Sequence, residues 1–307
     1  MSEQTPSAGL RKRADADGRD LTRPPAPEPL PIPVYDNHTH LEFEDGLEML
    51  APEESLDRAE AVGVRGVVQV GTDLETSRWA AGLAARDPRV LAAVALHPNE
   101  APRLFAEGRL SEHLSEISRL AAQPRVRAVG ETGLDFFRTG EDGRASQLES
   151  FEAHIEIAKQ NGVALQIHDR DAHEAVVAAL LRVGAPERTV FHCFSGDAAL
   201  ARTCAEHGWY LSFAGTMTFK NAPALREALA AADPSRILVE TDAPFLTPEP
   251  YRGRPNAPYL MPHTVRRMAE VLDEPLDELC IRLAANTERV YGSWDTGTGA
   301  DTGADPR

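Results

Sequence analysis

Apolar and polar positions alternate in blocks along this chain, and the blocks predict repeated strand–helix units. Short apolar, β-branched runs predict eight strands, at 33–38, 64–71, 89–96, 125–131, 162–168, 188–192, 209–214 and 236–241. Amphipathic stretches such as PEESLDRAEAVG and SQLESFEAHIEIAKQNG lie between them, and 262–291 adds two more predicted helices. Several of these stretches open with Asp or Ser and close with Gly, as helix capping favours.

Eight strands that alternate with helices predict an α/β fold of the (β/α)8 TIM-barrel type over residues 34–292. A doubly wound open sheet is the alternative. No strand is followed by the GxGxxG phosphate turn that such sheets often carry, so the barrel is favoured. The flanking segments 1–33 and 293–307 are proline-rich or of low complexity and offer few large apolar residues. We expect both to be disordered tails, with the basic RKR at 11–13 solvated.

Composition narrows the class of protein further. The 307 residues include 42% hydrophobic residues, enough for a large core, but no apolar run approaches the roughly 20 residues that span a bilayer. The N-terminus has no hydrophobic signal region, and three cysteines without a CxxC pair argue against a disulfide framework. We expect a soluble, cytoplasmic protein. The net charge of −16 disfavours broad coating of nucleic acid but allows a local basic rim around a cleft.

Residues able to bind a metal stand at the ends of five predicted strands: His38, His40, Glu131, His168, His192 and Asp242. His38 and His40 are two apart, so both imidazoles can face the barrel mouth. Each residue alone would more often be structural, as a surface histidine, an ion pair or a helix cap. Active sites of such barrels lie at the carboxyl ends of the strands, so six such residues there predict one metal site.

The segments DNHTHL, ALHP, GETGLDFF, IHDRDA, FHCFSG, ETDAPFLTP and YRGRPNAP occur in this order from about residue 34 to 292. In them the chain resembles the TatD family of metal-dependent hydrolases and deoxyribonucleases. The resemblance implies two divalent ions (Mg, Mn or Zn), one held by His38, His40 and Asp242, the other by His168 and His192, with Glu131 bridging. It implies catalytic roles for Glu131, Asp242 and His97, where Asp242 orients or deprotonates the attacking water. His97 would contact phosphate or assist proton transfer, although a satisfied loop histidine is its alternative.

Cationic and aromatic side chains follow several of the same strands. Arg138, Arg170, Arg252 and Arg254 fall just beyond strand ends, where they could bind substrate phosphates. Surface ion pairs are the alternative for each of them. Phe136 and Phe137 could stack an unpaired base, but packing under a loop is the favoured interpretation.

Three functions are compatible with these residues. The first is a metal-dependent phosphodiesterase that acts on DNA ends or single strands, with DNA as a transient partner. The second is an amidohydrolase or lactonase on the same scaffold, where a carbamylated lysine often bridges the metals at the end of strand four. Glu131 stands at that position here, which favours the first. The third, a catalytically silent binding module, is disfavoured because six costly buried polar groups would have no use. Oligomeric state cannot be read from the sequence.

Overall fold

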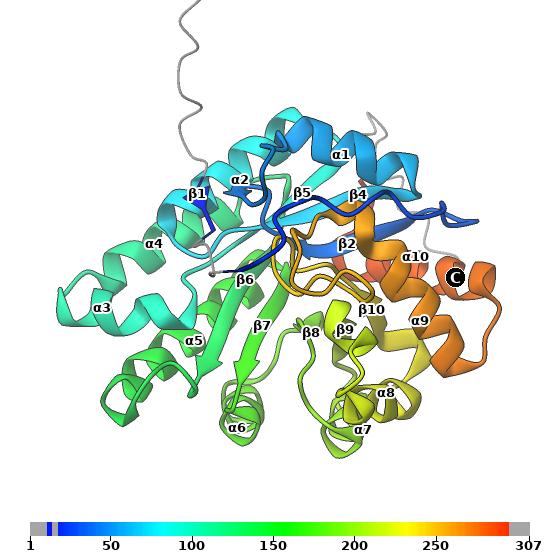
Figure 1. The fold of residues 1–307 in the computed structure, drawn as a ribbon. Coiled ribbons are helices and arrows are strands. Elements are labelled where there is room, and N and C mark those ends of the chain that lie inside the picture. Colours follow the sequence, from blue (N-terminus) through cyan, green and yellow to red (C-terminus); the bar gives the residue numbers. More distant parts are fainter. Residues whose placement is uncertain (1–10, 14–17, 295–307) are drawn as a thin grey trace, which may run out of the picture.

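A computed structural model describes residues 11–13 and 18–294 of the chain (Figure 1). Its main feature is one sheet of eight parallel strands in the order β2-β4-β5-β6-β7-β8-β9-β10. The strands are β2 (Val34–Thr39), β4 (Val64–Val70), β5 (Val90–Val94), β6 (Val126–Asp135), β7 (Ala164–Arg170), β8 (Thr189–Phe191), β9 (Tyr210–Phe213) and β10 (Ile237–Val239). Each coincides with a predicted strand, and the predicted barrel class is confirmed.

The first and last strands meet in a short seam that closes the sheet into a barrel. Thr39 forms a parallel bridge with Ala243, and the His40 amide donates to the Ala243 carbonyl at 2.8 Å. The Asp242 amide donates to the His38 carbonyl at 2.9 Å. Below these contacts Asp36, fully buried, accepts hydrogen bonds from the Thr241 amide and hydroxyl. Burial raises the pKa of Asp36 to about 8, against the opposing effect of the Thr241 hydrogen bonds.

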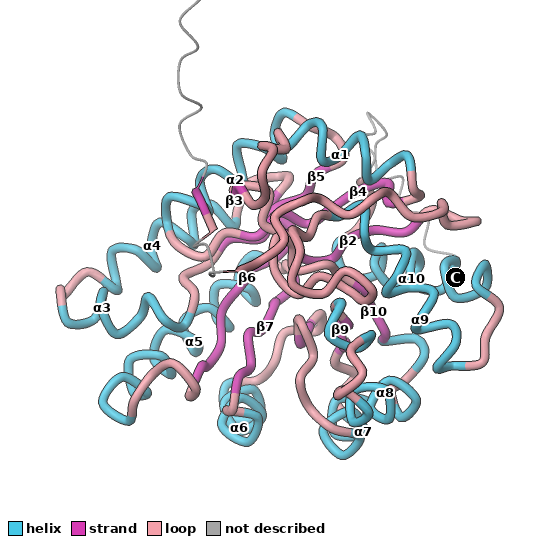
Figure 2. Tube along the Cα trace, viewed as in Figure 1, coloured by secondary structure: helices cyan, strands magenta, loops and turns pink. Residues whose placement is uncertain are grey.

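Helices follow the strands and surround the sheet (Figures 1 and 2). They are α1 (Pro52–Ala61), α2 (Leu74–Arg86), α3 (Ala101–Ala106), α4 (Leu110–Ala121), α5 (Glu141–Asn161), α6 (His173–Val183), α7 (Ala198–Glu206), α8 (Pro223–Ala231), α9 (Met261–Leu272) and α10 (Leu276–Tyr291), with short 3₁₀ turns η1 (Pro98–Glu100), η2 (Gly215–Thr218), η3 (Pro234–Arg236) and η4 (Pro258–Leu260). Asp73 and Asp197 cap α2 and α7 with their carboxylates, as predicted for helices that open with Asp. Helix α3 was not predicted, and α5 begins five residues before its predicted start.

The strands divide the core into two layers because their side chains alternate in direction. Val67, Ala92 and Val129 belong to the larger cluster, which includes the buried faces of the helices. Val68 and Leu91, each a sequence neighbour of one of these residues, belong to a second cluster that includes the end of α10 and Trp294. Trp294 stacks on Tyr35 with ring centroids 4.1 Å apart and is 7% exposed. The prediction of a disordered C-terminal tail is therefore wrong at residues 293–294. The remainder of that segment lies outside the described residues.

The N-terminal segment 18–33 packs against the barrel, so the prediction of a disordered tail is wrong there. Arg19 binds both carboxylate oxygens of Asp45, at 3.1 and 2.8 Å, and the Gly253 carbonyl at 2.9 Å. Leu30 is buried, and its amide donates to the Val62 carbonyl. The basic residues 11–13 are also placed, because β1 (Arg11–Lys12) pairs in parallel with β3 (Phe43–Glu44). Residues 1–10 and 14–17 lie outside the described part. Within the described residues, no helix is long and apolar enough to cross a membrane.

Candidate metal centre

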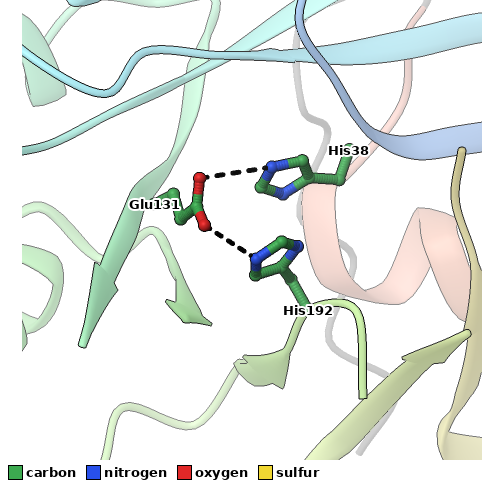
Figure 3. A group of neighbouring side chains, drawn as sticks. All are labelled: His38, Glu131 and His192. Carbon is green, nitrogen blue, oxygen red and sulfur yellow. Dashed lines mark hydrogen bonds and ion pairs between the residues drawn. The ribbon is translucent and has the colours of Figure 1, made fainter. Parts of the chain in front are cut away.

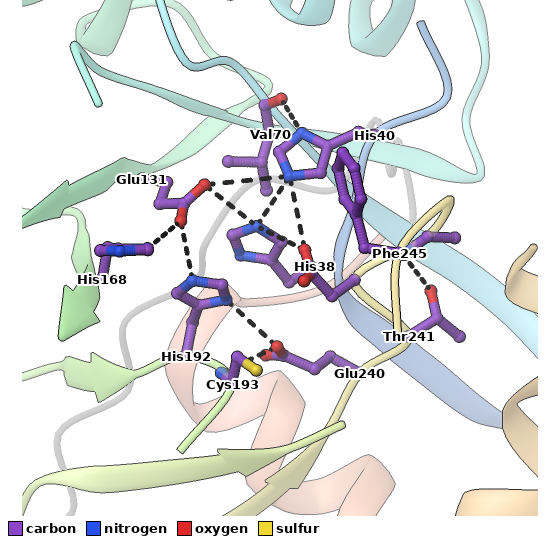
Figure 4. A network of polar contacts seen from close by, with 12 residues as sticks. His38, His40, Val70, Glu131, His168, His192, Cys193, Glu240, Thr241 and Phe245 are labelled. Atoms are coloured by element: carbon purple, nitrogen blue, oxygen red, sulfur yellow. Dashed lines mark hydrogen bonds and ion pairs between the residues drawn. The ribbon is translucent and has the colours of Figure 1, made fainter. Parts of the chain in front are cut away.

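The six predicted ligands lie together at the carboxyl end of the barrel, and Figure 4 shows the four histidines around Glu131. His38 and His40 come from the end of β2, and their Nε2 atoms are 3.2 Å apart, as their spacing predicts. Asp242 follows β10, and its Oδ1 is 3.8 Å from Nε2 of His38 and 3.6 Å from Nε2 of His40. The seam between the two ends of the sheet therefore forms part of the site.

Glu131, within β6, stands between two sets of imidazoles. Its Oε1 lies 2.6 Å from Nδ1 of His168 and 2.9 Å from Nε2 of His192. Its Oε2 lies 3.7 Å from Nε2 of His38 and 3.8 Å from Nε2 of His40. Burial alone would raise the pKa of Glu131, but the surrounding imidazoles, His192 first among them, hold it well below its usual range. The carboxylate thus stays ionised, with one oxygen directed to each set (Figure 3).

Three overlapping groups of these side chains have the size of a metal-binding cluster. Their ligand atoms lie within 4.8 Å of one another in each group: His38, His40 and Asp242; His38, Glu131 and His192; His97, Glu131 and His168. The first and third groups share no residue. This grouping includes His97, which was expected to contact substrate, beside the six predicted ligands.

The donor atoms fit a divalent cation. Nδ1 of His40 lies 3.0 Å from the Val70 carbonyl, so Nδ1 carries a proton, and Nε2 presents a lone pair whenever the ring is neutral. That lone pair faces Nε2 of His38, whose Nδ1 is buried without a hydrogen-bond partner among the described residues. A divalent cation between the two facing imidazole nitrogens, with the carboxylates of Glu131 and Asp242 beside them, would satisfy all of these groups in their buried site. Mixed imidazole and carboxylate ligation suits zinc and manganese.

Two buried carboxylates orient the histidines from behind and were missed at the sequence level. Oε1 of Glu240 lies 3.1 Å from Nδ1 of His192 and accepts the Cys193 amide at 2.8 Å (Figure 4). Oδ2 of Asp135 lies 3.3 Å from Nε2 of His168. Such partners fix the ring orientation of a metal-bound histidine and raise its basicity. The motifs ETD and GLD, which contain Glu240 and Asp135, are the sequence feature that could have indicated these two carboxylates.

His97 differs from the other histidines in the direction of its lone pair. Its Nδ1 accepts the Asn99 amide at 3.1 Å, which places the proton of the neutral ring on Nε2. Nε2 lies 3.5 Å from Oε1 of Glu131. Burial lowers the pKa of His97, although the Glu131 carboxylate opposes this effect. The ring is thus a neutral hydrogen-bond donor toward the centre, which suits a substrate or proton-transfer role better than metal ligation.

The four predicted phosphate-binding arginines occupy different surroundings. The guanidinium of Arg170 lies over the Phe137 ring and that of Arg252 over the Phe219 ring, at 4.1 and 4.2 Å from the centroids. Arg138 is exposed directly after β6. Arg254 instead donates to the Thr22 and Arg23 carbonyls, so its side chain holds the N-terminal segment.

Comparisons with known proteins identify the family of the chain. Residues 35–292 match the family model described as TatD related DNase. An "uncharacterized metal-dependent hydrolase TatD" of Mycobacterium tuberculosis is 45% identical over 263 residues, covering 84% of this chain and 98% of the relative. A "3'-5' ssDNA/RNA exonuclease TatD" of Citrobacter rodentium is 33% identical, covering 78% and 91%. The crystal structure of YJJV, a TatD homologue from Escherichia coli K12, superposes with a TM-score of 0.76 at 27% identity, covering 85% and 98%.

The fold and the site define a metal-dependent hydrolase built on a TIM barrel. With a family match over most of its length and a relative at 45% identity, the chain belongs to the TatD family.

Proposed function

We propose that this protein is a two-metal phosphodiesterase that cleaves DNA, at ends or in single strands. The observation that carries the proposal is the position of Glu131, whose two carboxylate oxygens face separate sets of imidazoles. A carboxylate so placed suits the bridge of a two-metal site. The name of the Citrobacter rodentium relative, an exonuclease of single-stranded DNA and RNA, supports the same reaction class.

The chain's own residues divide the work in this proposal. His38, His40 and Asp242 would hold one ion and His168 and His192 the other, with Glu131 shared. Divalent ions bound there would polarise the phosphodiester and lower the pKa of water. The Asp242 side chain is 14% exposed, more than those of Glu131, His38 and His40, so its carboxylate can orient or deprotonate the attacking water. Nε2–H of His97 can donate to a phosphate or leaving-group oxygen.

Substrate phosphates would contact the basic side chains of the rim. Arg170 ends β7, Arg138 and Arg252 follow β6 and β10, and no ion pair of theirs occurs within residues 11–13 and 18–294. Arginine binds phosphate with two parallel hydrogen bonds, so each can hold the backbone of a strand. These few cations sit on an acidic protein of net charge −16, which suits transient binding better than tight coating.

The choice among hydrolases on this scaffold depends on the bridging group. An amidohydrolase or lactonase with a carbamylated bridging lysine needs that lysine at the end of the fourth barrel strand. β6 is that strand; its sequence contains no lysine, and Glu131 is the residue of β6 that faces the imidazoles. A silent binding module would not require six metal-ligand side chains gathered at one end of the barrel.

The test is cleavage of labelled single-stranded and duplex DNA by the purified protein, with EDTA or with added Mg²⁺, Mn²⁺ or Zn²⁺. We expect metal-dependent phosphodiester cleavage that Glu131→Gln removes while the fold is retained. Glu187→Gln is the matched control, since Glu187 is exposed and lies between α6 and β8. No cleavage under any metal, with bound metal verified by elemental analysis, would refute the proposed activity.

A further inference from the structure

One aromatic ring at the rim of the metal centre is exposed beneath a cation. We propose that Phe137 and Arg170 form a subsite for an unpaired nucleobase and its adjoining phosphate. This inference rests on the proposed function and names what the site recognises beyond the scissile phosphate: the flat face of a base.

The main chain holds the two side chains together. β6 and β7 pair up to their carboxyl ends, with Asp135 opposite Arg170, and the Phe136 amide donates to the Arg170 carbonyl at 2.9 Å. The Arg170 guanidinium carbon lies 4.1 Å from the centroid of the Phe137 ring. The pair is therefore built on the ends of two core strands and not on a long loop.

The pair adjoins the metal centre through both strands. Arg170 is two residues after His168 on β7, and Phe137 is two residues after Asp135 at the end of β6. Asp135 and His168 are themselves in contact, at 3.3 Å. A strand of nucleic acid with its phosphate at the metal centre would thus have a neighbouring nucleotide within reach of the pair.

The two neighbouring phenylalanines have opposite surroundings. Phe136 is partly buried and packs on the core, as the sequence favoured. Phe137 is 63% exposed, so the prediction of packing under a loop is wrong for it. With the guanidinium over one face of the ring, much of the remaining ring surface is open to solvent. A scattered exposed apolar residue is ordinary, but one paired with a cation beside a reactive centre has the form of a stacking platform.

Arg170 is available to a ligand. Its side chain makes no hydrogen bond or ion pair to any described residue, and its contact is the ring of Phe137. A base stacked on Phe137 would leave the guanidinium donors free for the phosphate beside it. Phe219 with Arg252 repeats the pairing at 4.2 Å, but Phe219 is half-buried and offers less surface. Because bases in a duplex are stacked on each other, the subsite selects single strands.

The experiment compares a short fluorescein-labelled oligothymidine with an abasic oligomer of the same length and charge. Binding is measured by fluorescence anisotropy in EDTA, and cleavage as kcat/KM with Mn²⁺. We expect Phe137→Ala to weaken binding and kcat/KM for oligothymidine about tenfold, within the range of a single base–aromatic stack, and to leave the abasic oligomer unaffected. Phe137→Trp should restore the wild-type preference, and Arg170→Lys should weaken both oligomers.

Phe105→Ala is the matched control, because Phe105 is 55% exposed on α3 and no cation of the described residues lies over its ring. If Phe137→Ala lowered binding and kcat/KM equally for both oligomers, or lowered them for neither, the proposed subsite would be overturned. Equal binding of the two oligomers by the wild-type protein would overturn it as well. If the wild-type protein binds but cleaves neither oligomer, the proposed function fails, while the base dependence of binding still decides the subsite.

Discussion

Oε1 of Glu240 lies 3.1 Å from Nδ1 of His192, on the side of the ring away from Glu131. The Glu240 side chain is fully buried, and burial raises its pKa even though the charge of His192 opposes this. The contact fixes which nitrogen of His192 faces the centre. Glu240 is therefore part of the metal site although it does not reach the metal-binding atoms.

Glu240→Ala is expected to lower metal affinity by about 10- to 100-fold, since His192 loses the partner that orients it. Glu240→Gln should have a smaller effect because the amide oxygen can still accept from Nδ1. Titration of the metal-free protein with Mn²⁺ or Zn²⁺ by calorimetry measures both. Unchanged affinity in Glu240→Ala would mean that the ring is held in place by packing alone.

Metal removal should lower thermal stability. A ligand that binds only the folded state contributes about 2.7 kcal/mol when its concentration is 100 times its dissociation constant. Melting curves in EDTA and in rising Mn²⁺ should therefore show a concentration-dependent increase in Tm. Glu131→Ala is expected to lose most of that increase, because it removes the side chain that both sets of histidines face.

His97→Ala should reduce turnover without removing metal. If Nε2–H donates a proton or hydrogen bond to the substrate, the loss in kcat is expected to be about 10²- to 10⁴-fold, typical of general acid–base groups. Metal content, measured by elemental analysis, should stay at the wild-type value because the lone pair of His97 is directed to Asn99. Loss of metal together with activity would instead make His97 a ligand.

Asp45 should stabilise the fold because it holds the arginines of the N-terminal segment against the barrel. Its carboxylate is 2% exposed and pairs with Arg13 and Arg19, at 3.1 and 2.8 Å. Asp45→Asn leaves two cations without their countercharge, and we expect a loss of about 3 kcal/mol in the free energy of unfolding. Arg58→Ala is the control, since its pair with Glu54 is exposed and should contribute under about 1 kcal/mol. Urea denaturation compares the two.

His154 should make stability depend on pH in the acid range. It is fully buried in α5, where Nε2 accepts the Leu96 amide, and burial lowers its pKa to about 4. The unfolded chain, with a pKa near 6.5, binds the proton more readily. The contribution of neutral His154 to the free energy of unfolding is therefore complete above about pH 6.5. It is lost as the pH falls towards 4, by roughly 3 kcal/mol. His154→Gln should flatten that part of the stability curve relative to the wild type.

The positions of the strands, and the histidine and carboxylate side chains at their ends, were predictable because both depend on local pattern. The alternation of apolar and polar stretches predicted every barrel strand. The positions of Glu131 and Asp242 followed from the rule that the carboxyl ends of barrel strands converge on one site. β6 runs on to Asp135, beyond its predicted end at 131, because pairing with β7 outweighs the two glycines of GETGLD.

What the sequence did not reveal depends on contacts between distant residues. Segment 18–33 is too polar to predict as ordered, and it is held by partners such as Asp45 and Gly253 that only the fold brings near. Glu240 and Asp135 resemble many other acidic residues until their histidines are placed beside them.

The seam of the barrel has a consequence for how the protein acquires its activity. His38 and Asp242 lie about 200 positions apart in the chain and meet only when β10 has docked beside β2. A nascent polypeptide still on the ribosome can present its early histidines, but it has no complete cation-binding pocket until nearly the whole barrel has emerged. In the proposed site, the ion held by His38, His40 and Asp242 would therefore be bound tightly only late in maturation, after the two ends of the sheet have met.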